Sequence, residues 1–210
     1  MNSIVIQVAS PEHISYAESI SWLIEESAKK RGTGIAKRTP EYIIKKINEK
    51  KAIIALSKAG ELVGFCYIET WGEKEYVANS GLVVSPDFRN AGIAKKIKKM
   101  AFEHSQKTFP GAKLFGLTTS LPVMKINSEL GYYPVTFSEL TKDEEFWKGC
   151  QSCVNYEILQ SKNKANCLCT GMLFDPVAKR QKKWNFLTQS KLFRRLIGSK
   201  NEEKTKGIIA

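Results

Sequence analysis

The pattern of hydrophobic and polar positions predicts a series of strands and helices over the first 140 residues. Short apolar runs bounded by turn residues indicate strands, whereas apolar positions three and four residues apart indicate amphipathic helices. The expected strands cover residues 4–9, 52–56, 62–70, 75–84, 112–118 and 133–137. The expected helices cover residues 11–29, 95–107 and 121–130, with one more that opens at Pro40.

Local signals mark where several of these elements begin and end. Thr39 is suited to cap a helix whose first position is occupied by Pro40, because proline has no N–H that needs a partner there. The turn residues at 58–61 separate two apolar runs, so the strands 52–56 and 62–70 are expected to form a hairpin.

The segment from Ser80 to Ile97 is the most informative part of the chain. An apolar strand ends at Val84, and a loop with a proline then leads through a turn of small residues, 89–94, into a helix. Such a turn leaves backbone N–H groups unpaired at the positive end of a helix dipole, which suits a phosphate group. The sequence therefore indicates a ligand that carries phosphate, such as a nucleotide-like cofactor.

This turn resembles the acyl-CoA loop of the GNAT family of N-acetyltransferases. Arg89-x-x-Gly92-x-Ala94 follows a strand end and a proline, as the family pattern Gln/Arg-x-x-Gly-x-Gly/Ala does. Gly131-Tyr132 resembles the end of a second family landmark, and the order of expected elements matches the family core. The resemblance spans about residues 1–140 and implies the GNAT fold, an α/β (α+β) fold with a mixed, mostly antiparallel sheet flanked by helices.

The resemblance also implies a cofactor and the residues that hold it. In the family, the loop N–H groups bind the pyrophosphate of CoA, while the preceding strand separates from its neighbour and pairs with the pantetheine arm. The expected contacts come from Leu82, Val83 and Val84 on the strand and from Arg89, Asn90, Ala91, Gly92, Ile93 and Ala94 on the loop. Acetyl-CoA or another acyl-CoA is the expected donor, with succinyl-CoA as an alternative.

The expected reaction is direct attack of an amine on the thioester of the acyl-CoA. A backbone N–H near residues 82–84 would stabilise the oxyanion. The tyrosine that often protonates the departing thiolate in this family is replaced here by Asn127, which could hydrogen-bond the CoA sulfur. Ser128 lies next to it and is a second candidate, and the alternative for Asn127 is an ordinary polar position on a helix flank.

A base must accept the proton of the attacking ammonium group. The family often places a carboxylate about ten residues before the glycine loop, but residues 78–80 are Ala-Asn-Ser and carry none. Glu75 is therefore the candidate base, with Glu69 as the other nearby strand carboxylate. Either could act directly or through water, and each also fits an ordinary surface position.

The loop between the first two expected helices gathers the cations Arg31, Lys37 and Arg38 with two glycines. The resemblance implies that this loop borders the acceptor site, and a forked guanidinium pairs well with a carboxylate. A carboxylate-bearing acceptor such as glutamate is thus expected, since the chain resembles small GNAT proteins of arginine biosynthesis that N-acylate glutamate. The alternatives are a solvated basic loop, or contacts to a succinyl carboxylate or to the CoA 3′-phosphate.

Four cysteines fall in one segment, in two close pairs: Cys150 and Cys153, then Cys167 and Cys169. Two pairs at this separation suit a tetrahedral structural zinc site, which would stabilise a segment without apolar periodicity. Reduced cysteines near the active site, a disulfide and a catalytic thiol are the alternatives.

Charge is concentrated at the end of the chain. Residues 177–210 hold ten Lys or Arg and two Glu, which is +8 of the total of +12 and leaves +4 for the first 176 residues. The mildly basic body argues against a nucleic-acid partner. The stripe from Trp184 to Ile197 fits an amphipathic helix that could lie on an anionic surface, dock on the body or a partner, or simply end the chain.

These observations divide the chain into a GNAT acyl-CoA-binding core at 1–140, a Cys-rich extension at 141–176 and a basic tail at 177–210. No apolar run approaches the length of a membrane span and the start lacks the pattern of a signal peptide, so a cytoplasmic protein is expected. A small-molecule substrate is the expected partner, and a homodimer is kept open as the assembly.

The sequence therefore predicts an acyl-CoA-dependent N-acyltransferase that acts on a small, carboxylate-bearing amine. A protein or peptide N-acetyltransferase is the second hypothesis. A non-catalytic acyl-CoA sensor or interaction module is the third, and the missing tyrosine and base carboxylate favour it slightly.

Overall fold

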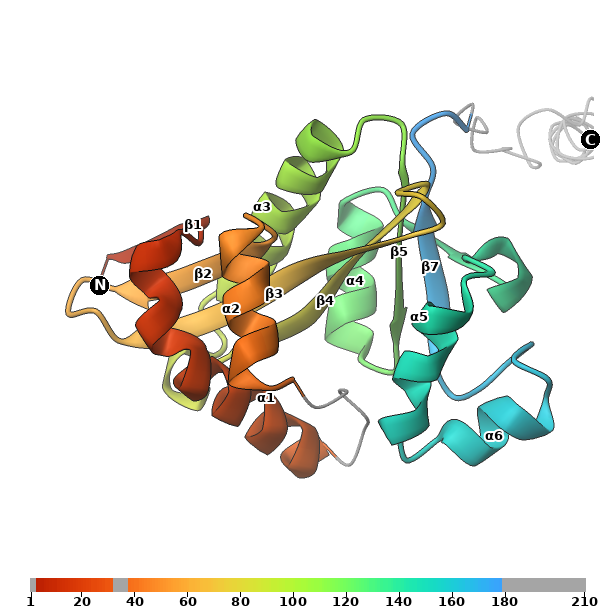
Figure 1. The fold of residues 1–210 in the computed structure, drawn as a ribbon, viewed down its shortest axis with the longest axis horizontal. Helices are drawn as coiled ribbons and strands as arrows, with labels where there is room; N and C mark the ends of the chain where they lie inside the picture. The colour runs from red at the N-terminus through yellow and green to blue at the C-terminus, as the bar shows by residue number, and fades with distance from the viewer. Residues whose placement is uncertain (1–2, 32–37, 179–210) are drawn as a thin grey trace, which may run out of the picture. The chain divides into compact units, whose positions relative to one another are not determined.

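One seven-stranded sheet with helices on both faces organises the molecule (Figure 1). This computed structural model describes residues 3–31 and 38–178, although not the side chain of Arg31. The strands are β1 (Ile4–Val8), β2 (Ala52–Ser57), β3 (Leu62–Trp71), β4 (Tyr76–Val84), β5 (Lys113–Thr118), β6 (Tyr133–Val135) and β7 (Thr170–Phe174). The α-helices are α1 (Ala17–Arg31), α2 (Pro40–Asn48), α3 (Ile93–Thr108), α4 (Leu121–Glu129), α5 (Glu144–Lys148) and α6 (Tyr156–Ser161).

The sheet is mixed and mostly antiparallel, as predicted. Its strand order is β1-β2-β3-β4-β5-β7-β6, and β4 and β5 form the parallel pair, while the other neighbours are antiparallel. A parallel pair needs a crossover, and α3 provides it between β4 and β5. The fold is therefore the GNAT-like α/β arrangement that the resemblance implied.

Alternation along β3 assigns the helices to the two faces of the sheet. Tyr67 belongs to the apolar cluster formed with α1 and α2, whereas its neighbour Cys66 belongs to the cluster under α3. On the Tyr67 face, a further cluster joins Ala78 of β4 and Phe115 of β5 to Trp147 of α5. Helices α1, α2 and α5 thus cover one face, while α3 and α4 cover the other (Figure 1).

The Cys-rich segment supplies a strand that the sequence pattern did not predict. Strand β7 lies between β5 and β6 and pairs with both. Gly171 of β7, for example, lies opposite Leu117 of β5 on one side and Val135 of β6 on the other. Its apolar run is short, follows two cysteines and precedes a proline, which obscures the strand pattern. Residues 141–176 therefore contribute to the sheet itself, and the compact unit that contains the sheet ends at Pro176.

Other differences from the expected elements are local. The segment expected as one helix over 11–29 is a 3₁₀ helix, Pro11–Tyr16, followed by α1. Short 3₁₀ helices also form at Pro86–Phe88, Phe137–Glu139 and Gly149–Ser152. The expected tail helix over 184–197 lies outside the described residues. Within the described part of the chain, no helix is long and apolar enough to cross a membrane.

Candidate active site

The predicted phosphate loop joins β4 to α3 with the expected geometry. Gly92 is the N-cap of α3 and has a φ of 71°, and Asn90 has a φ of 64°, so both take the left-handed conformation. The first bond of α3 runs from the Lys96 N–H to the Gly92 carbonyl. The N–H groups of Ile93, Ala94 and Lys95 therefore have no acceptor inside the helix and can serve an anion.

Gly92 is needed for its backbone conformation rather than for lack of room. A Cβ at this position would meet no atom within 4 Å, which leaves open space in front of the helix end. Arg89 lies in the same loop, and its Nε–H donates to the Val84 carbonyl at 3.1 Å. That bond ties the loop to the end of β4, so Arg89 holds the loop in shape.

Beside this loop, β4 separates from β5. The parallel pairing between them covers Tyr76–Lys113, Val77–Leu114 and Ala78–Phe115 and stops there. From Asn79 to Val84, strand β4 keeps its pairing with β3, with a shift of register near Cys66. The edge of β4 that faces β5 is therefore open from Asn79 to Val84, in the manner expected for a strand that pairs with an extended cofactor arm.

Gly81 marks the point where the register shifts, and it lies under an aromatic ring. It has a φ of 64°, and a Cβ there would come within 2.4 Å of Cε1 of Tyr67. The Tyr67 ring thus rests directly on the backbone of β4, one residue before Leu82. This contact couples the α2 face of the sheet to the strand end that was expected to stabilise the oxyanion.

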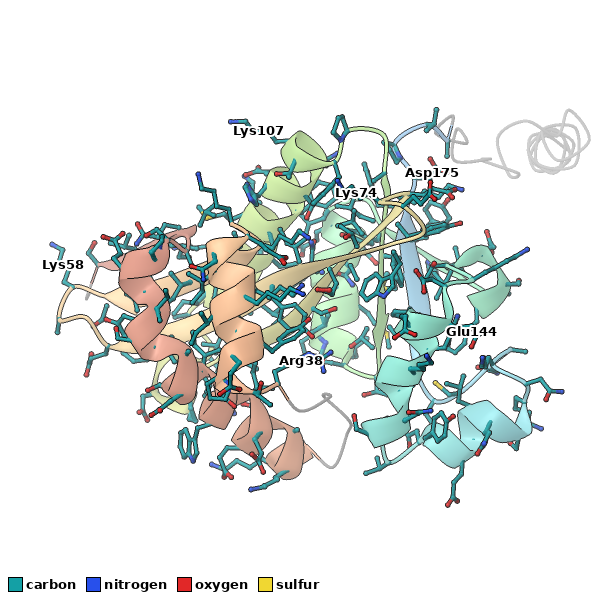
Figure 2. All side chains as sticks on the ribbon, in the orientation of Figure 1. Arg38, Lys58, Lys74, Lys107, Glu144 and Asp175 are labelled. Carbon is teal, nitrogen blue, oxygen red and sulfur yellow. The ribbon has the colours of Figure 1, made fainter. Side chains whose placement is uncertain are left out.

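Arg38 lies two residues before α2 (Figure 2) and contacts Tyr67. Its Nε–H donates to the Tyr67 hydroxyl oxygen at 2.8 Å, and its guanidinium lies 4.9 Å from the centroid of the Tyr42 ring. The Tyr42 ring meets the Tyr67 ring edge-on, with 5.4 Å between their centroids. Burial raises the pKa of both phenols, which stay neutral. Of the three predicted acceptor cations, Arg38 is thus placed at the open strand end. Lys37 and the side chain of Arg31 lie outside the described residues.

A buried ion pair extends this arrangement along the same face. The ammonium of Lys46 contacts the Glu69 carboxylate, lies 3.6 Å from Glu49, and sits 5.1 Å from the Tyr42 ring centroid. Burial lowers the pKa of Lys46 to about 8, although Glu49 opposes that shift. We call Arg38, Tyr42, Lys46, Tyr67 and Glu69 the acceptor-face cluster.

The register of the sheet places this cluster over the point where β4 leaves β5. Tyr67 pairs with Ser80, and Glu69 pairs with Ala78, so these side chains share one face at adjacent positions. Glu69 therefore supplies a carboxylate beside Ala78, where the family pattern expects one within β4 itself. Its Oε1 is buried and makes no hydrogen bond of normal geometry in the described structure, despite the contact with Lys46.

On the opposite face, a second cation is buried beneath the same point. Lys98 of α3 is 2% exposed, and its Nζ donates to the Asn79 carbonyl at 3.1 Å. The Asn79 side chain donates to Ser105 at 2.7 Å and accepts from the Tyr132 hydroxyl at 3.4 Å. Burial lowers the pKa of Lys98 to about 8. This polar network was not predicted from the sequence.

The two predicted catalytic residues of α4 differ in their surroundings. Asn127 is 2% exposed, its amide N–H donates to the thioether of Met172 at 3.7 Å, and its Oδ1 has no partner in the described structure. An unpaired buried oxygen can accept from a ligand donor. Ser128 is exposed on the outer side of the helix, so the structure does not bring the two side chains to one place.

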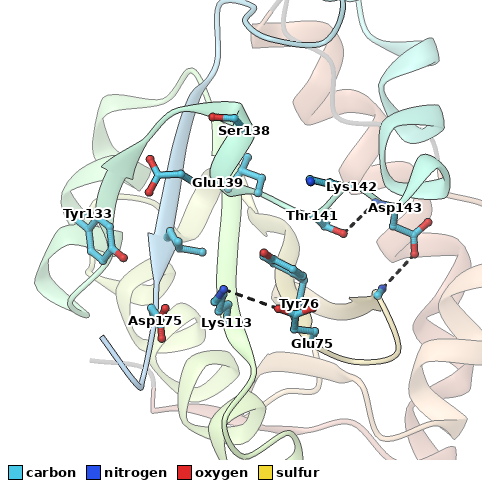
Figure 3. Close-up of a pocket in the computed structure, with 13 residues that line it drawn as sticks. Glu75, Tyr76, Lys113, Tyr133, Ser138, Glu139, Thr141, Lys142, Asp143 and Asp175 are labelled. Carbon is cyan, nitrogen blue, oxygen red and sulfur yellow. Dashed lines mark hydrogen bonds and ion pairs between the residues drawn. The ribbon is translucent and has the colours of Figure 1, made fainter. Parts of the chain in front are cut away.

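Glu75 lies at the other end of β4 from the phosphate loop. It precedes Tyr76, and residues 76–82 separate it from Val83, which corresponds to about 26 Å of extended chain. Glu75 lines a cavity of about 640 Å³ (Figure 3), and its carboxylate lies 3.8 Å from Lys113 Nζ. Glu75 is therefore far from the open strand end, because the two lie at opposite ends of β4.

The four clustered cysteines are free, partly buried thiols. Cys150, Cys167 and Cys169 pack against the apolar cluster of α5, α6 and β5. Burial raises the pKa of Cys150 to about 11 and that of Cys169 to about 12 in the metal-free protein. Among the side chains of residues 3–30 and 38–178, no group of three or more His, Cys, Asp or Glu is arranged to hold a metal ion. The donor set suits zinc but its arrangement does not, so the zinc prediction gains no support.

The fold and this open strand end define a class of α/β proteins in which two neighbouring parallel strands of a mixed central sheet diverge. A sequence model of the acetyltransferase (GNAT) family matches residues 17–125, which is more than half of the 210-residue chain. The chain therefore belongs to the GNAT acetyltransferases. A comparison with curated proteins finds no significant match.

Solved structures of the same fold include several with CoA. The N-acetylglutamate synthase from Neisseria gonorrhoeae, complexed with coenzyme A and N-acetyl-glutamate, is 19% identical with a TM-score of 0.58. The alignment covers 83% of this chain but 35% of that one, so this chain spans about a third of the synthase. Rv2747 from Mycobacterium tuberculosis, in complex with CoA and NLQ, is 15% identical with a TM-score of 0.58, covering 81% of this chain and 98% of that one.

A third structure is that of yncA from Salmonella typhimurium with its cofactor acetyl-CoA. It is 10% identical with a TM-score of 0.55, and the alignment covers 82% of this chain and 94% of that one. At these identities, the three likenesses establish the shared fold.

Proposed function

We propose that this GNAT enzyme transfers an acyl group from acyl-CoA to the amine of a small, carboxylate-bearing acceptor, with glutamate as the first candidate. The observation that carries the proposal is the position of Arg38, which hydrogen-bonds Tyr67 directly over the open end of β4. A guanidinium held on two aromatic rings beside a strand that binds the thioester is suited to orient a carboxylate near the reacting carbon. The Neisseria synthase is complexed with N-acetyl-glutamate, the acylated form of the same amino acid.

The donor half would use the residues predicted from the loop. The N–H groups at the start of α3, with Asn90, Ala91 and Gly92, would bind the pyrophosphate. The pantetheine arm would pair with the open edge of Leu82, Val83 and Val84, which leads its sulfur toward Asn79. One backbone N–H of this edge would then stabilise the oxyanion. Acetyl-CoA and succinyl-CoA both remain candidate donors.

Proton transfer would be carried by the acceptor face. We assign the base role to Glu69 in place of Glu75, because Glu69 pairs with Ala78 beside the open strand end. The Glu69 carboxylate, held by Lys46, would accept the ammonium proton directly or through a water. The amine nitrogen would then attack the thioester carbonyl carbon and the C–N bond would form. The nitrogen would pass its second proton to water, and the sulfur would leave with the electron pair of the C–S bond.

The test follows CoA thiol release in the presence of acetyl-CoA or succinyl-CoA and each of several amines. We expect release with glutamate and much slower release with an amine of similar length that lacks carboxylates. Release with a lysine-containing peptide but with no amino acid would favour the protein acetyltransferase alternative. CoA binding without thiol release from any amine would favour a non-catalytic sensor.

A further inference from the structure

Lys98 is a buried cation without a carboxylate partner among the described residues. Its Nζ donates to one backbone carbonyl, that of Asn79, and lies 5.5 Å from the centroid of the Tyr132 ring. The other nearby titratable groups are neutral, because burial raises the pKa of the Cys66 thiol to about 11 and also raises that of Tyr132. A buried ammonium is costly in an apolar interior, so its retention indicates a role that an apolar side chain cannot fill.

The position of Lys98 is fixed by the geometry of the strands. Asn79 is the first residue of β4 beyond its last pair with β5, Ala78–Phe115. The ammonium therefore lies at the point where the two strands diverge. Hydrogen bonds from the Asn79 amide to Ser105 and from Tyr132 to Asn79 hold the surrounding groups in place.

This is also the point that the sulfur end of the cofactor would reach. With the pyrophosphate at the start of α3 and the arm along the open edge of β4, the thioester lies toward Asn79. The family position for an acid is Asn127 in this chain, and an amide cannot protonate a thiolate. The departing sulfur thus needs another source of stabilisation, and a positive charge in a water-poor site acts strongly on a nearby anion.

We propose that Lys98 stabilises the CoA thiolate as the C–S bond breaks, a role that rests on the proposed acyl transfer. The acceptor nitrogen bonds to the carbonyl carbon, and the sulfur departs with the electron pair of the C–S bond. The ammonium of Lys98 offsets the new negative charge without losing its own proton. The thiolate takes a proton from solvent when CoA is released.

The test measures the thiol pKa of bound CoA, which does not depend on the acceptor. CoA is titrated in complex with the full-length protein by the ultraviolet absorbance of the thiolate, with the desulfo-CoA complex as the blank. The proteins compared are wild type, Lys98→Met, Lys98→Arg and Lys99→Met. Lys99 is the exposed neighbour on the same helix and serves as the matched control.

We expect the thiol pKa of CoA bound to wild type to fall at least one unit below that of free CoA. Lys98→Arg and Lys99→Met should keep the shift, and Lys98→Met should abolish it while CoA still binds. In the thiol-release assay, Lys98→Met should lower kcat at least tenfold with both acetyl-CoA and succinyl-CoA.

An unshifted thiol in wild type, or the same shift in Lys98→Met, would overturn the proposal. Loss of turnover confined to succinyl-CoA would also overturn it and would assign Lys98 to the carboxylate of the acyl group. A Lys98-dependent shift without turnover of any amine would instead reject the proposed function and leave the charge effect on CoA established.

Discussion

At the residue scale, two turn glycines, Gly92 and Gly111, are required for their backbone conformation and not for close packing. Gly92 has a φ of 71° and open space around it, and Gly111 has a φ of 83° with the same open space. A side chain at either position strains the backbone. The open space in front of Gly92 is where the CoA pyrophosphate is expected, whereas Gly111 lies in the turn before β5.

Gly92→Val should therefore weaken CoA binding at least tenfold, because the new side chain both strains the loop and occupies the anion site. Gly111→Val is the matched control, and it should lower the stability by a similar amount while leaving CoA affinity unchanged. Calorimetric titration with CoA measures the difference. Equal affinity of Gly92→Val and wild type would show that this loop does not bind the cofactor.

Lys98 gives a second prediction at this scale, on stability rather than on binding. Burial lowers its pKa from 10.5 to about 8, a gap that corresponds to roughly 3 kcal/mol in favour of the neutral form. Replacing a buried charge by a well-packed apolar side chain often stabilises a protein by roughly 1–4 kcal/mol. Lys98→Met should thus raise the free energy of unfolding at neutral pH even as it lowers activity.

The pH dependence of that gain has a definite sign. Between pH 8 and 10.5 the unfolded chain holds the Lys98 proton that the folded chain has released, so wild-type stability rises with pH in this window. The advantage of Lys98→Met should be largest below pH 8 and should vanish above 10.5. Denaturant unfolding at several pH values measures it, and a destabilised Lys98→Met would assign Lys98 a packing role.

Some residues of the site could be predicted from the sequence and others could not. The turn between β4 and α3 was predictable, because a glycine among small residues favours the left-handed conformation that Gly92 takes at the helix start. Phosphate binding by this turn stays a prediction. Lys98 was missed because lysine is rarely buried, although it shares a helical stripe with the buried residues Ala101 and Ser105. Glu69 could be ranked over Glu75 only from the pairing register, which a single sequence does not give.

At the scale of elements, the Cys-rich segment contributes strand β7, which packs closely against its neighbour β6. Gly171 packs so closely that a Cβ there would be 2.9 Å from the Val135 carbonyl of β6. Gly116 of β5 lies opposite Met172 of β7. A Cβ on Gly116 would meet no atom within 4 Å. The two glycines therefore form a matched pair on adjacent strands.

Gly171→Ala should destabilise the protein by about 1–3 kcal/mol, because the methyl group meets backbone that cannot move without shifting a strand. Gly116→Ala should change the stability little. The midpoints of denaturant unfolding compare them. Equal stability of the two variants would show that β6 and β7 are not packed as described.

Hydrophobic periodicity predicted most of the helices and strands, but it missed β7. The strands that are bounded by turn residues and the helices with clear stripes were predicted close to their observed positions. Strand β7 was missed because its short run, Thr170–Phe174, follows a cysteine pair that drew a metal interpretation. Its pairing with β5 and β6 is long-range, and such pairing leaves little local signal.

At the scale of the whole molecule, the proposed function assigns proton removal and charge stabilisation to opposite faces of one sheet. The acceptor-face cluster lies over the divergence of β4 and β5, and the Lys98 network lies beneath it. The thioester would lie between them, so that proton removal and charge stabilisation act from opposite sides. Under the proposal, Glu69 and Lys98 would take the places of the base carboxylate and the tyrosine that the family pattern expects.

The two candidate carboxylates test this division directly. Glu69→Gln should lower kcat about 100-fold or more, as expected for loss of a general base, with CoA affinity unchanged. Glu75→Gln should behave like wild type, because its side chain is exposed at the far end of β4. Steady-state kinetics of thiol release compare them, and a larger loss in Glu75→Gln would reverse the assignment.

The most direct measurement of the central claim is the KM for glutamate in wild type, Arg38→Met and Lys58→Met. Lys58 is an exposed cation in the β2–β3 turn and controls for loss of charge (Figure 2). We expect turnover of glutamate by wild type and Lys58→Met. We expect at least a tenfold higher KM for glutamate in Arg38→Met, with an unchanged KM for acyl-CoA. Turnover of glutamate that is insensitive to Arg38→Met, or no turnover of any carboxylate-bearing amine, would contradict the central claim.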